Sequence, residues 1–345
     1  MIQKSNNKKP FKKGSIKKIT IPEFLEQILK GNITYLSRAI TLIESVKESD
    51  KVKATKLLQA CLPHSNKSIR IGITGVPGVG KSTFIEAFGS FLTGLDKKVA
   101  VLAVDPSSAI NKGSILGDKT RMESLVNDKN AFIRPSPAGD SLGGVAKKTK
   151  EAIILCETAG FDIILIETVG VGQSETLVHA MVDFFLLLKI TGAGDELQGI
   201  KRGIMEMADA IVINKADGDN VKKAELAKSE FSRALHLYPV KENQWLPKVT
   251  TCSALNKSGI GNVWQIITDF LQLTKSNTWF EKNRIIQNKN WLIQSINQQL
   301  QDDFYNNKKI RIELEKQLQS IDKKEITPFE ALQKIVEYYR TNDLN

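Results

Sequence analysis

The chain has 345 residues, enough for one large α/β domain with helical additions or for two domains, and it carries a formal net charge of +11. Its three Cys are scattered and odd in number, which argues against a disulfide framework and favours a reducing compartment. No apolar run is long enough to span a bilayer. We therefore expect a cytoplasmic protein with no membrane segment.

The excess positive charge lies at the start of the chain. Residues 1–22 contain seven Lys and no Asp or Glu, and they have no apolar stretch of the kind found in secretory signals. Such a segment can contact nucleic acid or an acidic surface, but its composition is more typical of a solvated, disordered tail. We expect residues 1–20 to form that tail, with no nucleic-acid partner.

Residues 21–66 are predicted to be helical. Pro22 stands where the first turn of a helix tolerates proline. The apolar residues that follow have helical spacing, which indicates a face packed on a core. These residues are Leu36, Ala39, Ile40, Ile43 and Val46.

Between residues 67 and 274 the pattern alternates between short apolar runs and helical segments. This alternation predicts an α/β domain with a mostly parallel central sheet flanked by helices. Ligands of such sheets bind at the carboxyl ends of the strands. The expected strands are residues 69–74, 98–104, 131–134, 162–167, 184–190, 210–214 and 248–252.

The first of these strands runs into a phosphate-binding motif, G-x-x-x-x-G-K-S. Its glycines let the backbone amides point at a phosphate, and the helix that follows adds its positive end. We expect Lys81 to reach the terminal phosphates and the Ser82 hydroxyl to bind Mg²⁺, as in a P-loop NTPase. The predicted nucleotide-binding residues here are Gly75, Val76, Pro77, Gly78, Val79, Gly80, Lys81, Ser82 and Thr83.

Acidic residues follow two further strands. Asp105 ends one of them and is a candidate Mg²⁺ ligand. Glu167 ends another in the Walker B position, where Asp is more common, and is a second candidate. Gly170, three residues later, is spaced so that its amide can sense the γ-phosphate. Asp118 in a glycine-punctuated loop and Gln173 after Gly170 are candidates for orienting the attacking water.

The motif N-K-x-D follows the strand at residues 210–214 and predicts guanine recognition. A carboxylate at Asp217 would accept hydrogen bonds from guanine N1–H and the 2-amino group, whereas adenine offers no such pair of donors. A backbone amide of Ser253 or Ala254 would reach guanine O6. The predicted base-binding residues are Asn214, Lys215, Asp217, Ser253, Ala254 and Leu255. GTP and GDP are therefore the expected ligands, with GTP hydrolysis as the reaction.

Residues 275–345 show no α/β alternation and are predicted to form a helical extension. Its composition suits a dimerisation arm, although packing against the sheet domain is an alternative. The loop at residues 191–201, with two early glycines and flanking acids, receives no role from general rules.

Taken together, the motifs resemble the MeaB/ArgK family, the methylmalonyl-CoA mutase-associated P-loop GTPases. The matching stretches are residues 72–83, 103–108, 113–122, 133–137, 167–175, 192–200 and 214–217. The resemblance implies a homodimeric GTPase that gates adenosylcobalamin loading and protects an acyl-CoA mutase such as methylmalonyl-CoA mutase. It also implies that Asp105 and Glu167 serve Mg²⁺, that Asp118 belongs to the first switch and Gly170 to Gln173 to the second, and that residues 192–201 form a third. Thr191 stands where the family often has Pro.

Three alternatives stay open at this point. A small-molecule kinase or transport-associated NTPase would need an acceptor pocket, and N-K-x-D argues against ATP as its nucleotide. A nickel-insertion metallochaperone would need a Cys/His cluster, and the sequence offers only Cys61 and His64 close together. An RNA-binding GTPase would use the Lys-rich tail.

Overall fold

The computed structural model describes residues 19–104, 122–135, 142–168, 174–192 and 202–342, so residues 1–18 of the predicted tail lie outside it. The chain divides into two compact units, one of residues 1–68 with 151–161 and one of residues 69–150 with 162–345. Within the described ranges, no helix is both long and apolar enough to cross a membrane.

The described part of the first unit is mainly helical, as predicted. Thr20 caps the first helix with its hydroxyl, and Asn32 caps the second with its side-chain oxygen. Val46 does not continue the buried face: it is 88% exposed, because the second helix already ends at Glu44. The Ser45 hydroxyl donates to Asp50 (2.7 Å) where the third helix begins. The helices are α1 (Ile21–Leu29), α2 (Ile33–Glu44), α3 (Glu48–Cys61) and the short η1 (Leu62–His64).

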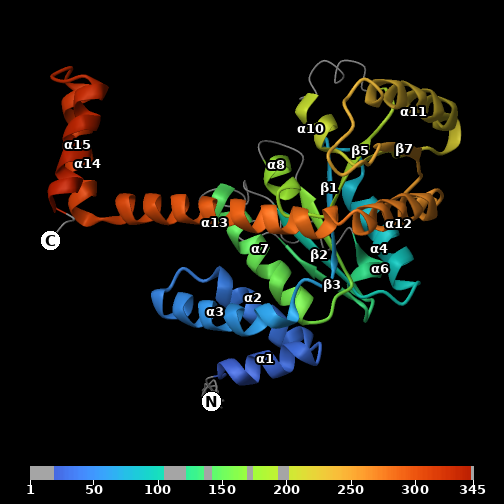
Figure 1. Cartoon of the computed structure of the whole chain (residues 1–345), viewed down its shortest axis with the longest axis horizontal. Coiled ribbons are helices and arrows are strands. Elements are labelled where there is room, and N and C mark those ends of the chain that lie inside the picture. The colour runs from blue at the N-terminus through green and yellow to red at the C-terminus, as the bar shows by residue number, and fades with distance from the viewer. Residues whose placement is uncertain (1–18, 105–121, 136–141, 169–173, 193–201, 343–345) are drawn as a thin grey trace, which may run out of the picture. The chain divides into compact units, whose positions relative to one another are not determined.

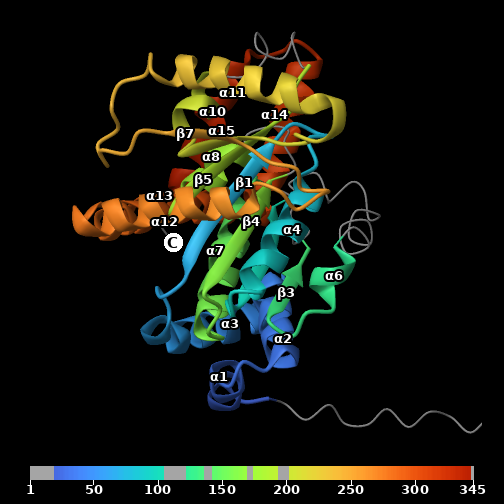
Figure 2. The ribbon, with the colours of Figure 1, turned by 90° about the vertical axis from the view of Figure 1, so that its right-hand side faces the viewer.

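The second unit contains a seven-stranded parallel sheet in the order β3-β2-β4-β1-β5-β6-β7. β1 therefore lies between β4 and β5, and Figure 2 shows these strands side by side. The α/β prediction is confirmed, with strand limits shifted by one residue in most cases. The strands are β1 (Ile69–Gly75), β2 (Val99–Val104), β3 (Ala131–Arg134), β4 (Ile163–Thr168), β5 (Phe184–Lys189), β6 (Ala210–Ile213) and β7 (Lys248–Thr251).

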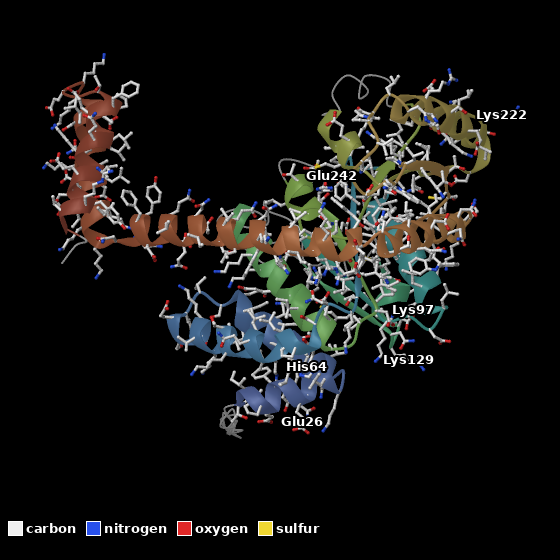
Figure 3. The ribbon with its side chains drawn as sticks, in the orientation of Figure 1. Glu26, His64, Lys97, Lys129, Lys222 and Glu242 are labelled. Atoms are coloured by element: carbon white, nitrogen blue, oxygen red, sulfur yellow. The ribbon has the colours of Figure 1, made fainter. Side chains whose placement is uncertain are left out.

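Successive side chains of a strand point to opposite sides of the sheet, so a wholly apolar strand needs a helix layer on each face. Both faces are covered here. Leu186 and Leu188 of β5 pack in a core with residues of α4 and α12, whereas Leu187 packs in a second core with residues of α10 and α11. Charged side chains such as Lys97, Lys129 and Lys222 are exposed (Figure 3). The helices are α4 (Lys81–Thr93), α6 (Glu123–Val126), α7 (Leu142–Thr158), α8 (Ser174–His179), α10 (Arg202–Met207), η2 (Gly218–Asn220), α11 (Val221–Leu235) and α12 (Ile260–Ser276).

The C-terminal extension is helical, as predicted, and consists of α13 (Trp279–Asn306), α14 (Lys308–Asp322) and α15 (Pro328–Asn342) (Figure 1). The early part of α13 is attached to the sheet unit, since Gln287 donates to the Val182 carbonyl (2.7 Å). Lys150 in turn donates to the Gln287 carbonyl (3.3 Å). Ile310 of α14 and Ile335 of α15 are buried, which gives these two helices apolar contacts of their own.

Candidate nucleotide site

The phosphate-binding loop lies between the end of β1 and the start of α4. Gly78 and Gly80 both have positive φ (81° and 89°), the conformation that glycine adopts without steric cost. Lys81 opens α4 and is buried, and its ammonium donates to the carbonyls of Gly75 (2.8 Å) and Val76 (3.3 Å). The lysine is therefore held over the loop that the sequence assigns to phosphate.

Two buried carboxylates act on that lysine. Burial lowers the pKa of Lys81, and the negative charges of Glu167 and Glu175 oppose this shift. Glu167 stands opposite Ile73 of β1 in the parallel register, which brings the predicted Mg²⁺ ligand beside the phosphate loop. Glu175 lies in the first turn of α8. Acidic residues are common in the first turn of a helix because of the helix dipole, so the sequence pattern alone does not single out Glu175.

A hydroxyl bridge joins the strands that lead into the two phosphate-side motifs. Thr168, the last residue of β4, donates to the hydroxyl of Thr74 on β1 (2.8 Å), and both side chains are buried. The bond ties the strand end before the phosphate loop to the strand end that lies two residues before the predicted second switch. Nothing in the sequence pattern distinguishes these two threonines from other strand residues.

Asn214 connects the phosphate loop to the base-binding segments. Its side-chain NH₂ donates to the Val79 carbonyl (2.9 Å), and its side-chain oxygen accepts from the Ala254 amide (3.2 Å). The Cys252 thiol also donates to that oxygen (3.4 Å). Burial, and secondarily the charge of Asp217, raises the pKa of Cys252 to about 12, so the thiol keeps its proton for this bond. Both ends of the N-K-x-D asparagine amide are thus bonded within the chain.

The carboxylate of Asp217 is oriented by the hydroxyl of Ser253, which donates to it. The Ser253 hydroxyl oxygen also accepts from the Asn256 amide (3.1 Å). The amides of Ser253 and Ala254 are occupied by Ser258 and Asn214 respectively. In this structure both amides predicted to reach guanine O6 therefore have partners within the chain.

The structure brings the predicted residues of the phosphate loop, Glu167 and the base segments to one edge of the sheet. Ser82 is half-buried in the first turn of α4, whereas Thr83 is exposed. Asp105, Asp118, Gly170 and Gln173 lie outside the described residues.

The predicted Mg²⁺ ligands fit the ion in their chemistry. Ser82 offers a hydroxyl and Glu167 a carboxylate, and Mg²⁺ prefers oxygen ligands. In the described ranges, no group of three or more His, Cys, Asp or Glu side chains is placed to hold a metal ion. Two protein oxygens are compatible with Mg²⁺, which usually keeps several waters and binds substrate phosphates as well.

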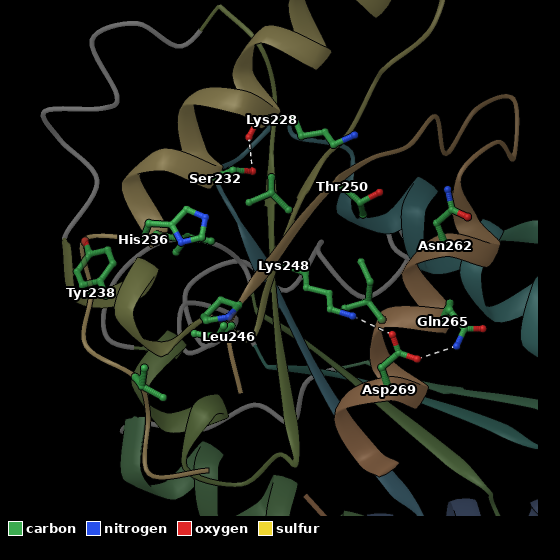
Figure 4. A pocket seen from close by; sticks show the side chains of 15 residues that line it. Lys228, Ser232, His236, Tyr238, Leu246, Lys248, Thr250, Asn262, Gln265 and Asp269 are labelled. Carbon is green, nitrogen blue, oxygen red and sulfur yellow. Dashed lines mark hydrogen bonds and ion pairs between the residues drawn. The ribbon is translucent and has the colours of Figure 1, made fainter. Parts of the chain in front are cut away.

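A separate cavity of ≈ 720 Å³ lies between α11, β7 and α12 (Figure 4). Lys248 and Gln265 both contact Asp269 within it (2.8 and 2.7 Å). None of the predicted site residues lines this cavity. The cavity is therefore separate from the predicted nucleotide site at the strand ends.

The fold and the phosphate-loop sequence define a P-loop nucleotide-binding protein, and the N-K-x-D motif is typical of those that bind guanine. More narrowly, the chain belongs to the MeaB family: the family model described as "Methylmalonyl Co-A mutase-associated GTPase MeaB" matches residues 36–309.

Named relatives and a solved structure agree with this family. The chain is 42% identical to the GTPase ArgK of Escherichia coli K12, over 94% of this chain and 98% of that protein. It is 45% identical to the mitochondrial methylmalonic aciduria type A homolog of Mus musculus, over 82% of this chain and 71% of that protein. A crystal structure of a LAO/AO transport system kinase superposes with a TM-score of 0.74 at 36% identity, covering 95% of this chain and all of that one.

Proposed function

We propose that this GTPase is a chaperone for an adenosylcobalamin-dependent acyl-CoA mutase, with methylmalonyl-CoA mutase as the first candidate. In this proposal GTP binding and hydrolysis in the cytoplasm gate cofactor loading and protect the mutase from inactivation. The main support is the match to a family described as mutase-associated over residues 36–309. The pre-ordered Asp217 carboxylate supports guanine as the base.

The proposed reaction is attack of water on the γ-phosphate of GTP. Lys81 neutralises charge on the terminal phosphates, and the backbone amides of the phosphate loop hold them. Bound Mg²⁺, held by Ser82 and Glu167 with Asp105, would supply further charge neutralisation. Asp118, with Gly170 and Gln173, is proposed to order the water and sense the γ-phosphate.

The mutase itself is proposed to accelerate hydrolysis. Sequence reasoning places no arginine clearly beside the γ-phosphate, and GTPases without such a residue are slow until a partner completes the site. Partner stimulation of GTPases reaches about 10³–10⁵-fold. A mutase that only received cofactor, without acting on the GTPase, would leave turnover unchanged.

The decisive experiment measures GTP turnover with and without methylmalonyl-CoA mutase, together with complex formation by analytical ultracentrifugation. Stimulation that disappears in Lys81→Ala supports the proposal, because this variant removes the phosphate-neutralising charge. Unchanged turnover and no complex, with either nucleotide bound, would reject it. Transfer of phosphate to a small acceptor in place of water would instead favour a kinase, the activity for which the solved relative is named.

We also propose that the C-terminal extension makes a homodimer. Ile293, Ile296 and Leu300 of α13 are each about half exposed and lie at helical spacing along one side. Exposed apolar stripes of this kind are typical of helix–helix interfaces. Ile296→Glu combined with Leu300→Glu should halve the mass measured by light scattering, whereas Gln299→Glu, an exposed polar position nearby, should not. A monomeric mass for the unaltered chain would contradict the proposal.

A further inference from the structure

Two side chains outside the predicted site hold the guanine-recognition loop. Thr191 follows β5, and its hydroxyl donates to the side-chain oxygen of Asn220 (2.5 Å). Asn220 ends η2, and its side-chain NH₂ donates to the carbonyl of Lys215 (2.7 Å). A continuous chain of hydrogen bonds therefore runs from the turn after β5 to the second residue of the N-K-x-D motif.

Lys215 is the point in this loop that most needs support. Its φ is +58°, the left-handed region that side chains other than glycine rarely occupy without a cost. The bond from Asn220 fixes the carbonyl of this strained residue. The backbone amide of Asn220 also donates to the Asp217 carbonyl (3.0 Å). Asn220 therefore holds the loop that carries Asp217 through both its side chain and its backbone.

The donor and acceptor chemistry makes Thr191 part of the same device. The Lys215 carbonyl can only accept, so the NH₂ end of the Asn220 amide must face it. The oxygen end then faces Thr191, whose hydroxyl is free to donate. Without that hydroxyl the half-buried Asn220 oxygen loses the bond that orients the amide.

We propose that Thr191 and Asn220 are positioning residues for guanine recognition, setting the place of the Asp217 carboxylate through Lys215. This inference rests on the proposed assignment of Asp217 as the acceptor for guanine N1–H and the 2-amino group. Neither residue touches the nucleotide in the proposal. Their effect is on how well the loop is ordered before the base arrives.

The test compares GDP with IDP, which lacks the 2-amino group and so makes one of the two hydrogen bonds. The dissociation constants of both nucleotides are measured by calorimetry for the unaltered chain, Thr191→Val, Asn220→Ala and Thr191→Ser. Thr268→Val is the matched control, because it removes a half-buried hydroxyl whose bond, to the Gln265 carbonyl (2.8 Å), lies within α12 and away from the base segments. Thermal unfolding without nucleotide is recorded for every variant.

We expect Thr191→Val and Asn220→Ala to weaken GDP binding by about three- to tenfold, the range of one ordinary hydrogen bond. We also expect them to lower the preference for GDP over IDP. A misplaced carboxylate loses its hydrogen bond to the 2-amino group first, and only GDP offers that bond. Thr191→Ser should keep both values, as should Thr268→Val. A general loss of stability would lower the unfolding temperature without changing the preference.

An unchanged preference in both Thr191→Val and Asn220→Ala would overturn the inference, whatever their unfolding temperatures. Asp217→Asn separates this failure from failure of the site assignment. If Asp217→Asn leaves the preference intact, then Asp217 does not read guanine and the proposed base site is wrong. If only Asp217→Asn changes the preference, the base site stands and the positioning role of Thr191 and Asn220 fails.

Discussion

The ion pair between Asp183 and Arg284 should be the strongest single attachment of α13 to the sheet unit. The guanidinium donates to both carboxylate oxygens, from Nε and Nη2, at 2.7 Å each. Both residues are buried, and one carboxylate oxygen also accepts from the Arg70 backbone amide (2.8 Å). The guanidinium further lies 4.4 Å from the centre of the Phe280 ring.

Arg284→Met removes the paired charge while keeping most of the apolar volume. Asp183 then stays buried with the Arg70 amide as a backbone donor but without the guanidinium, and breaking a buried pair in this way costs about 3–5 kcal/mol of unfolding free energy. Asp183→Asn should cost a similar amount for the opposite reason, because the buried guanidinium loses its carboxylate partner. The double variant buries neither charge, so its cost should fall at least about 1 kcal/mol short of the sum.

The assay is urea unfolding followed by circular dichroism for the two single variants and the double variant. Lys282→Met is the control on the same helix, since Lys282 and its partner Glu242 are both exposed (3.7 Å) and such pairs contribute about 0–1 kcal/mol. The reasoning is refuted if the loss of unfolding free energy in the double variant equals the sum of the losses in the two single variants within about 0.3–0.5 kcal/mol. Such additivity would mean that the two groups are not energetically coupled.

Three further outcomes follow from the buried ionisable groups. Burial, with a smaller effect of Arg70, lowers the pKa of Lys150 to about 8, so the folded chain binds fewer protons than the unfolded chain between about pH 8 and 10.5. The unfolding free energy of the unaltered chain should therefore rise relative to that of Lys150→Met as pH increases through this window, and a flat difference in pH-dependent urea unfolding would contradict this. Because Cys61, Cys156 and Cys252 are buried with raised thiol pKa values, a thiol reagent at pH 8 should label none of them quickly in the native chain and all three after denaturation. Lys81→Met should lower GTP turnover by about 10²–10³-fold. It should not lower the unfolding temperature in the absence of nucleotide, because burial already disfavours the charge of Lys81. A large drop in that temperature would show a structural role instead.

The sheet was predictable because its strands are short, almost wholly apolar runs with glycine or polar residues at their ends. β1 shows this directly, since the same residues that make it a buried strand lead into the phosphate loop. Val46 shows where apolar spacing fails as a signal of a buried helical face. Its spacing fits a helical face, but Ser45 leaves the helix and bonds to Asp50, a local competition that apolar spacing does not register.

The side-chain bonds that hold the site together were not predictable, because their partners are far apart in sequence. Asn214 and Val79 are 135 residues apart, and Arg284 and Asp183 are 101 apart. A motif identifies Asn214 as a base-site residue, but its bond to the phosphate loop depends on how β1 and β6 flank β5. General rules give no role to the loop that begins at Thr191, and its bond to Asn220 is seen only when η2 lies beside the end of β5.

The contact between Asn214 and Gly80 explains why the phosphate and base halves of the site cannot vary independently. A Cβ atom at position 80 would lie 2.9 Å from the Asn214 side-chain nitrogen, closer than real Cβ contacts occur. Any side chain there must displace the amide that bonds to Val79, and the same amide carries the bond to Ala254. A change that strains the phosphate loop therefore reaches the base segments through one side chain. The glycine before Lys81 is thus required for two reasons, its left-handed backbone and the space that Asn214 occupies.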